Sequence, residues 1–299
     1  MRKLKVALVG CGRISSVYRD AFQKLGNMID LLYAVDIDQE KAADFAADFD
    51  KCKAVKNYDS ILKENLDVIH LATPHHLHSE MAIKALRNNI NVLTEKPIAI
   101  NLQQADQMIS AAKNTGNQLG VIFQTRYVDG CKKIKEIIQQ GDLGKITNVL
   151  SYLAWSRKDK YYKNSDWKGT WDKEGGGVLI NQAIHSIDRV QWLIGDDVEW
   201  IRGNIATRTH NVAVEDVAEA TIKFKKGAIY QLYATNSFAY NRSIDIELVG
   251  EKGRAGLRKD KGWIELDNAQ KTEINSKNNE NVGEDYWGNS HIYQLKSFY

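Results

Sequence analysis

A glycine-rich turn near the start of the chain constrains the fold more than any other sequence feature. The apolar run Val6–Val9 leads into the turn Gly10–Ser15, and a helical pattern of apolar residues follows. Gly10 permits a tight turn, Gly12 lets the backbone approach a pyrophosphate, and the small Ser15 allows close packing of helix on strand. This order of strand, turn and helix predicts a dinucleotide-binding unit, with the phosphates at the helix N-terminus.

An acidic residue refines this prediction. Asp36 closes the second apolar run, Leu31–Val35, at the offset of roughly 20 residues expected for a ribose ligand. A carboxylate there accepts from the ribose hydroxyls and repels a 2′-phosphate, and neither Arg nor Lys stands at this turn. The cofactor predicted is therefore NAD rather than NADP. The alternative is a glycine turn beside a solvated Asp in a fold that binds another ligand.

The first half of the chain alternates short apolar runs with helical patterns. This alternation predicts a parallel, doubly wound Rossmann sheet. The expected strands are Val6–Val9, Leu31–Val35, Val68–Ala72, Asn91–Thr94 and Gln118–Phe123, and the expected helices are Ile14–Leu25, Glu40–Phe49, Ser79–Arg87 and Leu102–Lys113.

After Gly144 the pattern changes to longer runs with period-2 alternation, which predicts an open, mainly antiparallel sheet. One covering helix is expected at Val178–Ile194, after three consecutive glycines. The expected strands are Lys145–Trp155, Val198–Thr209, Ala218–Phe224, Ile229–Thr235 and Ile244–Val249. The fold class is thus α/β plus α+β, with an NAD-binding domain at 1–124 and a substrate-binding and oligomerisation domain at 125–299. Residues Asn268–Asp285 are polar and predicted to form a mobile loop.

Composition excludes several classes of function. The 41 basic and 38 acidic residues of the 299 are scattered, which argues against nucleic-acid binding. No run approaches the ~20 apolar residues of a membrane span, and the N-terminus lacks a signal-peptide core. The three cysteines are distant and never form a CxxC pair, so neither a disulfide framework nor a thiolate zinc site is expected. A cytoplasmic location in a reducing compartment is predicted.

The chain has only two prolines, and both follow the predicted ends of parallel strands, in Thr73-Pro74 and Glu95-Lys96-Pro97. Ligands bind at such strand ends. Together with the glycine turn, these motifs resemble the Gfo/Idh/MocA family of NAD(P)-dependent sugar oxidoreductases over nearly the whole chain. The resemblance implies that Glu95 contacts the nicotinamide-side ribose and that Lys96 faces the reacting sugar carbon. The cofactor-binding residues expected are Gly10, Gly12, Arg13, Ile14, Asp36, Thr73, Pro74, His78, Glu95 and Lys96.

A polar stripe marks the predicted helix of the second domain. Asn181, His185 and Asp188 fall at i, i+4 and i+7, beside an apolar stripe. Many members of the family have Asp-x-x-x-His here, so the resemblance implies an acid–base role for His185. Asn181 departs from that pattern and cannot carry charge. The predicted catalytic residues are Lys96, His185 and Asn181, with His185 favoured as the base because an ordinary histidine pKa of about 6.5 suits neutral pH.

Ordinary structural roles are the alternatives: Lys96 as a surface lysine and His185 as a helix histidine with a core hydrogen bond. The cluster His75, His76 and His78 lacks further ligands at recognisable spacing, so no metal is expected.

Aromatic residues with interleaved cations, between Trp155 and Trp171, are suited to sugar rings and anionic groups. Sheet-covering packing is the alternative. The predicted substrate-binding residues are Arg126, Tyr127, Arg157, Trp167 and Asp188. The segment Trp167–Trp171, the Asn-x-x-x-His variant and Arg208–Asp216 resemble the branch of the family that contains UDP-N-acetyl-2-amino-2-deoxyglucuronate 3-dehydrogenases.

The function expected is reversible hydride transfer between NAD and a secondary hydroxyl of a sugar, cyclitol or nucleotide sugar such as UDP-N-acetylglucuronate. A retained-NAD sugar–sugar oxidoreductase or glycosidase-like enzyme, and a non-catalytic sugar or NADH sensor, are the alternatives. The resemblance implies a homodimer or homotetramer. His291–Tyr299 is expected to begin an amphipathic helix that family members continue, so a truncated C-terminus is expected.

Overall fold

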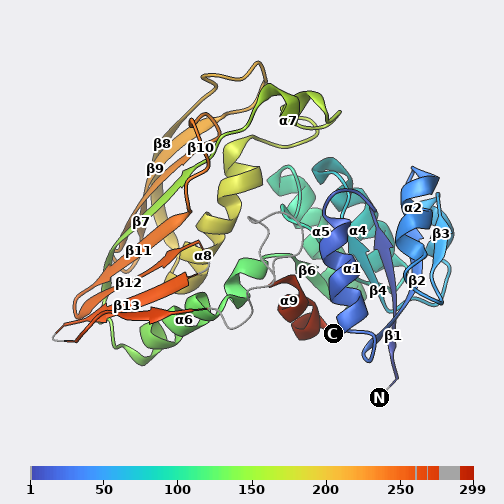
Figure 1. Ribbon diagram of the computed structural model, residues 1–299, viewed down its shortest axis with the longest axis horizontal. Helices are drawn as coiled ribbons and strands as arrows, with labels where there is room; N and C mark the ends of the chain where they lie inside the picture. Colours follow the sequence, from blue (N-terminus) through green and yellow to red (C-terminus); the bar gives the residue numbers. More distant parts are fainter. Residues whose placement is uncertain (1, 260, 268, 276–289) are drawn as a thin grey trace. The chain divides into compact units, whose positions relative to one another are not determined.

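The computed structural model describes residues 2–259, 261–267, 269–275 and 290–299, which form two compact units. The first contains residues up to Gln124 together with the C-terminal helix α9 (His291–Phe298), and the second begins at Thr125. In Figure 1 the first unit is blue to teal with α9 in dark red, and the second runs from green to orange. The sequence-based division places α9 in the second domain, whereas its apolar side chains belong to the core of the first.

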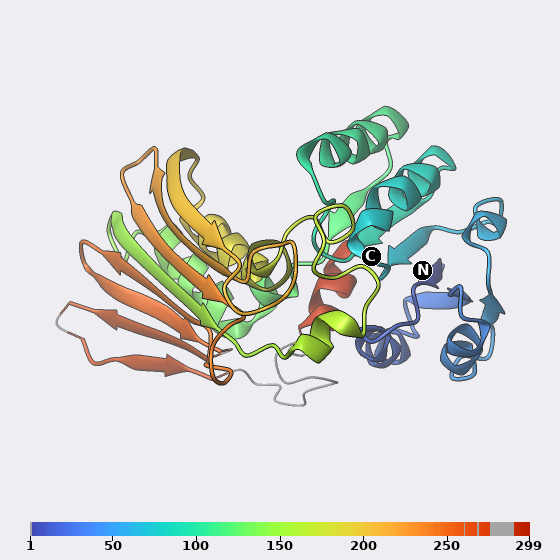
Figure 2. The ribbon, with the colours of Figure 1, turned by 90° about the horizontal axis from the view of Figure 1, so that it is seen from above.

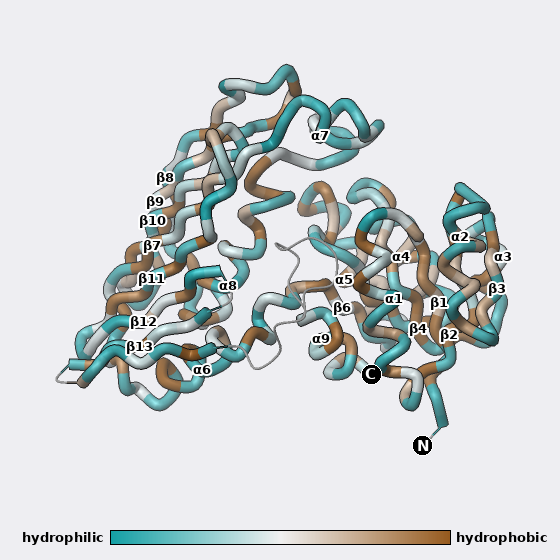
Figure 3. The backbone as a smooth tube through the Cα atoms, viewed as in Figure 1, coloured by the Kyte–Doolittle hydropathy of each residue, from teal (hydrophilic) through white to brown (hydrophobic). Residues whose placement is uncertain are grey.

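The first unit is a six-stranded parallel sheet in the order β3-β2-β1-β4-β5-β6. This order confirms the predicted Rossmann architecture. Its central strands are buried from both sides, and the tubes of β1 and β4 are largely brown in Figure 3. The strands are β1 (Leu4–Val9), β2 (Ile29–Val35), β3 (Lys53–Val55), β4 (Val68–Leu71), β5 (Asn91–Thr94) and β6 (Leu119–Val121). The helices are α1 (Ser15–Lys24), α2 (Gln39–Ala46), α3 (Tyr58–Ile61), α4 (His78–Arg87) and α5 (Leu102–Thr115), with the short turn η1 (His75–Leu77).

The second unit is an eight-stranded sheet in the order β14-β13-β12-β11-β7-β10-β9-β8, antiparallel except for the β7–β10 pair. The predicted mainly antiparallel sheet is therefore confirmed. The strands are β7 (Ile146–Ala154), β8 (Val198–Ala206), β9 (Val217–Phe224), β10 (Ile229–Thr235), β11 (Asp245–Gly250), β12 (Gly253–Arg258), β13 (Lys261–Leu266) and β14 (Thr272–Ile274).

Two helices cover one face of this sheet, rather than the single helix predicted from the sequence. Figure 2 shows α6 (Asp129–Gln140) in green and α8 (Ile184–Ile194) in yellow on that face. Ile134 of α6 and Leu193 of α8 share one core with Val149 and Leu232 of the strands. A π-helical turn, η3 (Leu179–Ala183), precedes α8, and the remaining short helices are η2 (Gln124–Tyr127) and α7 (Asp159–Lys163).

The polar segment predicted to be a loop is in part a strand. Thr272–Ile274 forms β14 and pairs with β13, because backbone pairing at a sheet edge needs no apolar side chains. Residues 268 and 276–285 of the predicted loop lie outside the described residues. Cys11, Cys52 and Cys131 are free thiols. Within the described part of the chain, every helix is too short or too polar to cross a bilayer.

Candidate active site

The glycine turn joins β1 to α1 and lies against the end of β4. Gly10 has φ +97°, and a Cβ there would lie 2.5 Å from the carbonyl oxygen of Ala72. Only glycine therefore allows β1 and β4 to approach at this edge of the sheet. A Cβ on Gly12 would instead meet no atom within 4 Å, so the backbone at Gly12 borders open space. Arg13 is exposed and Ile14 precedes the first turn of α1.

Asp36 lies where the sequence places it, at the end of β2 beside the glycine turn. Its Oδ2 accepts from the backbone N–H of Cys11 at 2.8 Å, and its Oδ1 accepts from that of Asp38 at 2.9 Å. The two bonds hold the carboxylate at the turn that a dinucleotide would follow.

Three further features fit the phosphates and ribose of NAD. Within the described residues, no side chain caps the N-terminus of α1, where the N–H groups of Ser15 and Val17 donate to the carbonyls of Gly12 and Ile14. The positive end of the helix dipole favours an anion at this end. The hydroxyl of Thr73 is buried without a hydrogen-bond partner among the described residues. With the open backbone of Gly12, these features fit a bound dinucleotide.

His78 connects the two proline loops. It is fully buried, with Nδ1 2.7 Å from the carbonyl oxygen of Pro97 and Nε2 2.9 Å from that of Thr73. Burial lowers the pKa of His78 although both carbonyls oppose the shift. His78 therefore links the two loops by hydrogen bonds. Pro74, which precedes η1, is half-buried.

Glu95 follows β5 and is held from one side. Its Oε1 accepts from the hydroxyl of Tyr18 at 2.9 Å and lies 3.7 Å from Nε2 of His291. Burial alone would raise the pKa of Glu95, but His291, Lys96 and Tyr18 together hold it below its ordinary value. Lys96, next in the chain, is half-buried and precedes a cis peptide bond to Pro97.

In the second unit, Glu215 fixes the start of the helix that carries the predicted catalytic stripe. Its carboxylate accepts from the N–H groups of Gly177 at 2.8 Å and Leu179 at 3.0 Å, and its carbonyl accepts from Val178. A Cβ on Gly177 would lie 1.8 Å from that carbonyl oxygen, so a glycine is required. The sequence marked Glu215 only by family resemblance, not as a helix cap.

Asn181 lies in the π turn η3 and is oriented by a buried acid. Its Nδ2 donates to Oε1 of Glu174 at 2.6 Å and to the hydroxyl of Tyr161 at 3.2 Å. Glu174 is 1% exposed, and its other oxygen accepts from the N–H of Gly169 at 2.6 Å. A carboxylate only accepts, so the amide of Asn181 must direct its nitrogen toward Glu174. π turns of this kind often occur at functional sites.

His185 begins the regular part of α8 and is half-buried, one turn after Asn181. Asp188, predicted to bind substrate, forms a bidentate ion pair with Arg126, with Arg126 Nε 2.8 Å from Oδ2 and Nη2 against Oδ1. Burial raises the pKa of Asp188 and the arginine opposes this shift. Two predicted substrate residues therefore bind each other. Tyr127 is half-buried, with the ammonium of Lys132 5.3 Å from its ring centre.

Arg157 and Trp167 belong to a column in which aromatic rings alternate with cations. The guanidinium of Arg157 lies 4.7 Å from the ring centre of Trp155 and 5.4 Å from that of Tyr161. Lys168 comes next in the column: its Nζ lies 3.8 Å from the ring centre of Tyr161 and 5.4 Å from that of Trp167. We call these five residues the cation–aromatic column.

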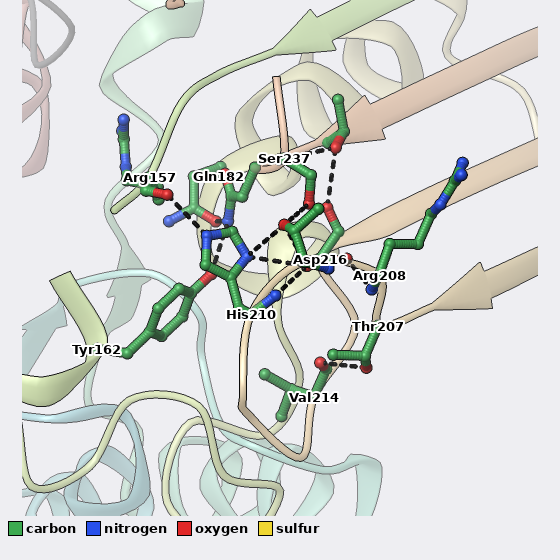
Figure 4. Close-up of polar contacts among 12 residues, drawn as sticks. Arg157, Tyr162, Gln182, Thr207, Arg208, His210, Val214, Asp216 and Ser237 are labelled. Atoms are coloured by element: carbon green, nitrogen blue, oxygen red, sulfur yellow. Dashed lines mark hydrogen bonds and ion pairs between the residues drawn. The ribbon is translucent and has the colours of Figure 1, made fainter. Parts of the chain in front are cut away.

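His210 lies between Asp216 and the backbone of Arg157, a member of this column, as Figure 4 shows. The imidazole lies between Oδ2 of Asp216, 2.8 Å from Nδ1, and the carbonyl oxygen of Arg157, 2.7 Å from Nε2. Burial would raise the pKa of Asp216, but the N–H groups of Thr209 and Arg208 hold it well below its ordinary value, together with His210 and Ser237.

The contacts of several supporting residues were not predicted from the sequence. Tyr18 and His291 contact Glu95 from distant parts of the chain. Tyr161 lies in the aromatic segment between Trp155 and Trp171, but its contact with Asn181 was not predicted, and neither was that of Glu174. The burial of Glu174 is visible only in the structure, and in the sequence Glu174 is one acidic residue among many. In the described part of the chain, no three His, Cys, Asp or Glu side chains are grouped to hold a metal ion.

Two family models match the sequence. Residues 4–123 match the model described as an oxidoreductase family with an NAD-binding Rossmann fold. Residues 131–256 match the GFO/IDH/MocA C-terminal domain.

Solved structures and curated proteins agree with these matches. The WlbA dehydrogenase from Chromobacterium violaceum, solved with NADH and UDP-GlcNAcA, is 30% identical with a TM-score of 0.82, over 87% of this chain and 75% of that one. WlbA from Bordetella pertussis, with the same ligands, is 27% identical with a TM-score of 0.83, over 99% and 84%. A glucose-6-phosphate 3-dehydrogenase from Bacillus subtilis is 28% identical, over 83% of this chain and 72% of that protein.

Proposed function

The chain belongs to the Gfo/Idh/MocA family of NAD-dependent sugar oxidoreductases, and we propose that its substrate is an anionic sugar, with a nucleotide sugar such as UDP-N-acetylglucuronate as the first candidate. The cation–aromatic column carries this proposal. It offers ring faces for stacking on a sugar or base and two cations, Arg157 and Lys168, for phosphate or carboxylate groups.

The three relatives named above fit an anionic substrate. The WlbA dehydrogenases were solved with a nucleotide sugar acid, and the relative from B. subtilis is named for a sugar phosphate. In each, the named ligand carries negative charge. The column would supply the matching positive charge in this chain.

Bound NAD supplies the hydride acceptor, so this chain's residues bind and orient the sugar and move its hydroxyl proton. We assign the removal of that proton to Nζ of Lys96 or to the imidazole of His185. Glu95, Asp36 and the glycine turn hold the cofactor. To Asn181, whose amide is oriented by Glu174, we assign a hydrogen bond to the substrate rather than a charge.

The proposal is tested by following NADH formation with UDP-N-acetylglucuronate, glucose 6-phosphate, glucose and myo-inositol. We expect the anionic sugars to have kcat/KM at least about tenfold above the neutral ones, which corresponds to about 1.4 kcal/mol. Arg157→Gln should raise KM for the anionic sugars and leave the neutral ones unchanged. Lys96→Ala should abolish turnover and leave NADH binding largely intact.

Two outcomes would overturn parts of this proposal. Equal kcat/KM for glucose and its phosphate would remove the anionic substrate class. Near-normal turnover by Lys96→Ala would remove Lys96 from proton transfer, while a chain that binds NADH but oxidises no sugar in the panel would contradict the substrate assignment as a whole.

A further inference from the structure

The C-terminal helix α9 and Tyr299, which follows it, contact the rest of the first unit through polar side chains at different places. His291 is 1% exposed and lies 3.7 Å from Glu95. Gln294 pairs with the edge strand β6, because it accepts from the N–H of Phe123 at 2.9 Å and donates to the carbonyl of Val121 at 2.8 Å. The hydroxyl of Tyr299 lies 2.7 Å from Nε2 of His70. The helix is therefore bound to the sheet in a fixed position.

The contact of α9 with Glu95 lies at the loop Glu95-Lys96-Pro97, one of the motifs predicted to bind the cofactor. Tyr18 of α1 and His291 of α9 both contact Oε1, and their rings pack edge-on with centres 6.1 Å apart. They leave Oε2 as the oxygen that they do not engage. When one oxygen of a carboxylate is held, the other points in a fixed direction. It can then accept hydrogen bonds from a pair of neighbouring hydroxyls.

We propose that His291 is a positioning residue for the cofactor: through Oε1 of Glu95 it fixes the carboxylate that receives the ribose hydroxyls of NAD. This inference rests on the cofactor role assigned to Glu95 under the proposed function. The C-terminal helix is then part of the cofactor site, not only of the core.

The charges around Glu95 support an ionised carboxylate. The titratable groups that face it are Tyr18 on α1, His70 on β4, His78 on α4, Lys96 next in the chain and His291 on α9. Burial lowers the pKa of His70 to about 3, so His70 is neutral and adds no charge. The pKa of Glu95 is held below its ordinary value mainly by His291, against its burial. Loss of His291 should raise it.

NADH binding by the purified full chain tests the inference without any turnover. We expect His291→Gln to raise the NADH Kd, measured by fluorescence titration, about tenfold at pH 8 and further at pH 6, because a protonated Glu95 accepts fewer hydroxyl hydrogen bonds. The wild-type Kd should change little over this range. Tyr18→Phe removes the other contact to Oε1 and should raise the Kd in the same direction, which keeps the test open if His291→Gln folds poorly.

Tyr299→Phe is the matched control. It removes a buried polar contact from the other end of the same helix but does not touch Glu95. We expect it to lower the melting temperature while the NADH Kd stays within about twofold. An unchanged Kd in His291→Gln, or an equal rise in Tyr299→Phe, would overturn the positioning role. If the wild type bound no NADH, the proposed function would fail instead, so the two failures are distinguishable.

Discussion

Asn181 and Glu174 form a pair in which one carboxylate serves two donors. Oε1 of Glu174 lies 2.6 Å from Nδ2 of Asn181, and Oε2 lies 2.6 Å from the N–H of Gly169. The carboxylate at this place is therefore that of Glu174, which contacts Asn181 directly. The neutral side chain at 181 is a requirement of its neighbour.

This pairing predicts that Asn181→Asp impairs the enzyme. A second carboxylate against Glu174 would force one of the two acids to take a proton. We expect kcat/KM to fall by about tenfold or more, within the coupling energies typical of residues in contact. Adding Glu174→Gln should restore much of it, because a glutamine amide can donate to the new Asp.

The four-variant cycle of wild type, two single variants and the double variant gives the measurement, with steady-state kinetics on the best sugar and with melting temperatures. Glu174→Gln alone should also lower kcat/KM, since Asn181 loses its acceptor. Asn181→Asp with wild-type activity, or a double variant that is worse than both singles, would contradict the pairing.

The positions of the proposed cofactor residues were predictable from sequence because these residues follow strands at fixed offsets. Gly10, Gly12 and Asp36 all lie at the carboxyl ends of parallel strands, where the local order of elements determines their place. The supports of Glu95 were not predictable. Tyr18 and His291 are 77 and 196 residues from Glu95 along the chain, and their contacts depend on how whole helices pack.

At the scale of elements, strongly patterned segments were predicted and weakly patterned ones were missed. Asn91–Thr94 and Ile229–Thr235 have the predicted bounds, because apolar runs flanked by turns permit few alternatives. The strand β12 contains two glycines, which give no β signal, and it exists because β11 and β13 pair with it. Helix α6 has apolar residues at helical spacing but begins with Asp129-Gly130, and it was missed.

The connection between β8 and β9 gives a pH-dependent prediction. Asp216 accepts from the N–H groups of residues 208, 209 and 210, and so organises the loop beside Arg157. Its pKa lies below the ordinary value in the folded chain, so its contribution to stability is present above about pH 4 and lost as the pH falls further. Asp216→Asn should lower the free energy of unfolding at pH 7 by about 2 kcal/mol, within the range for hydrogen bonds to a buried charge.

Urea unfolding followed by tryptophan fluorescence gives the measurement, because six of the seven tryptophans precede residue 264 and follow residue 154. The difference between wild type and variant should shrink on titration from pH 7 toward pH 3. Asp197→Asn is the control, since that carboxylate is exposed and paired only with Lys225 on the surface. A constant difference across this range would show that Asp216 stabilises the loop by shape rather than by charge.

At the scale of the whole molecule, the first unit is completed by residues that follow the second in the chain. Leu295 of α9 is fully buried and packs in the core that contains Val6, Leu8 and Ile122. The sequence predicted the helix from His291 but not its partner, since an amphipathic pattern gives the apolar face and not the surface that it covers.

Leu295→Ala therefore should destabilise the first unit. Truncation of a buried leucine costs about 2–5 kcal/mol. Hydrogen exchange should show faster exchange of the amides in α1 and β6, which α9 contacts, than in the wild type. Lys296→Ala, at an exposed position of the same helix, should leave those rates unchanged. Equal rates in Leu295→Ala and the wild type would mean that α9 adds nothing to that core.

The position of α9 also governs how such a protein can be recombined. An exchange of the second unit between relatives needs two crossover points, one near Gln124 and one before His291. A single crossover would join the sheet of one parent to the terminal helix of the other. His291, Gln294 and Tyr299 would then come from one parent and their partners Glu95, β6 and His70 from the other. Each such chimaera would begin with mismatched contacts at the proposed cofactor site.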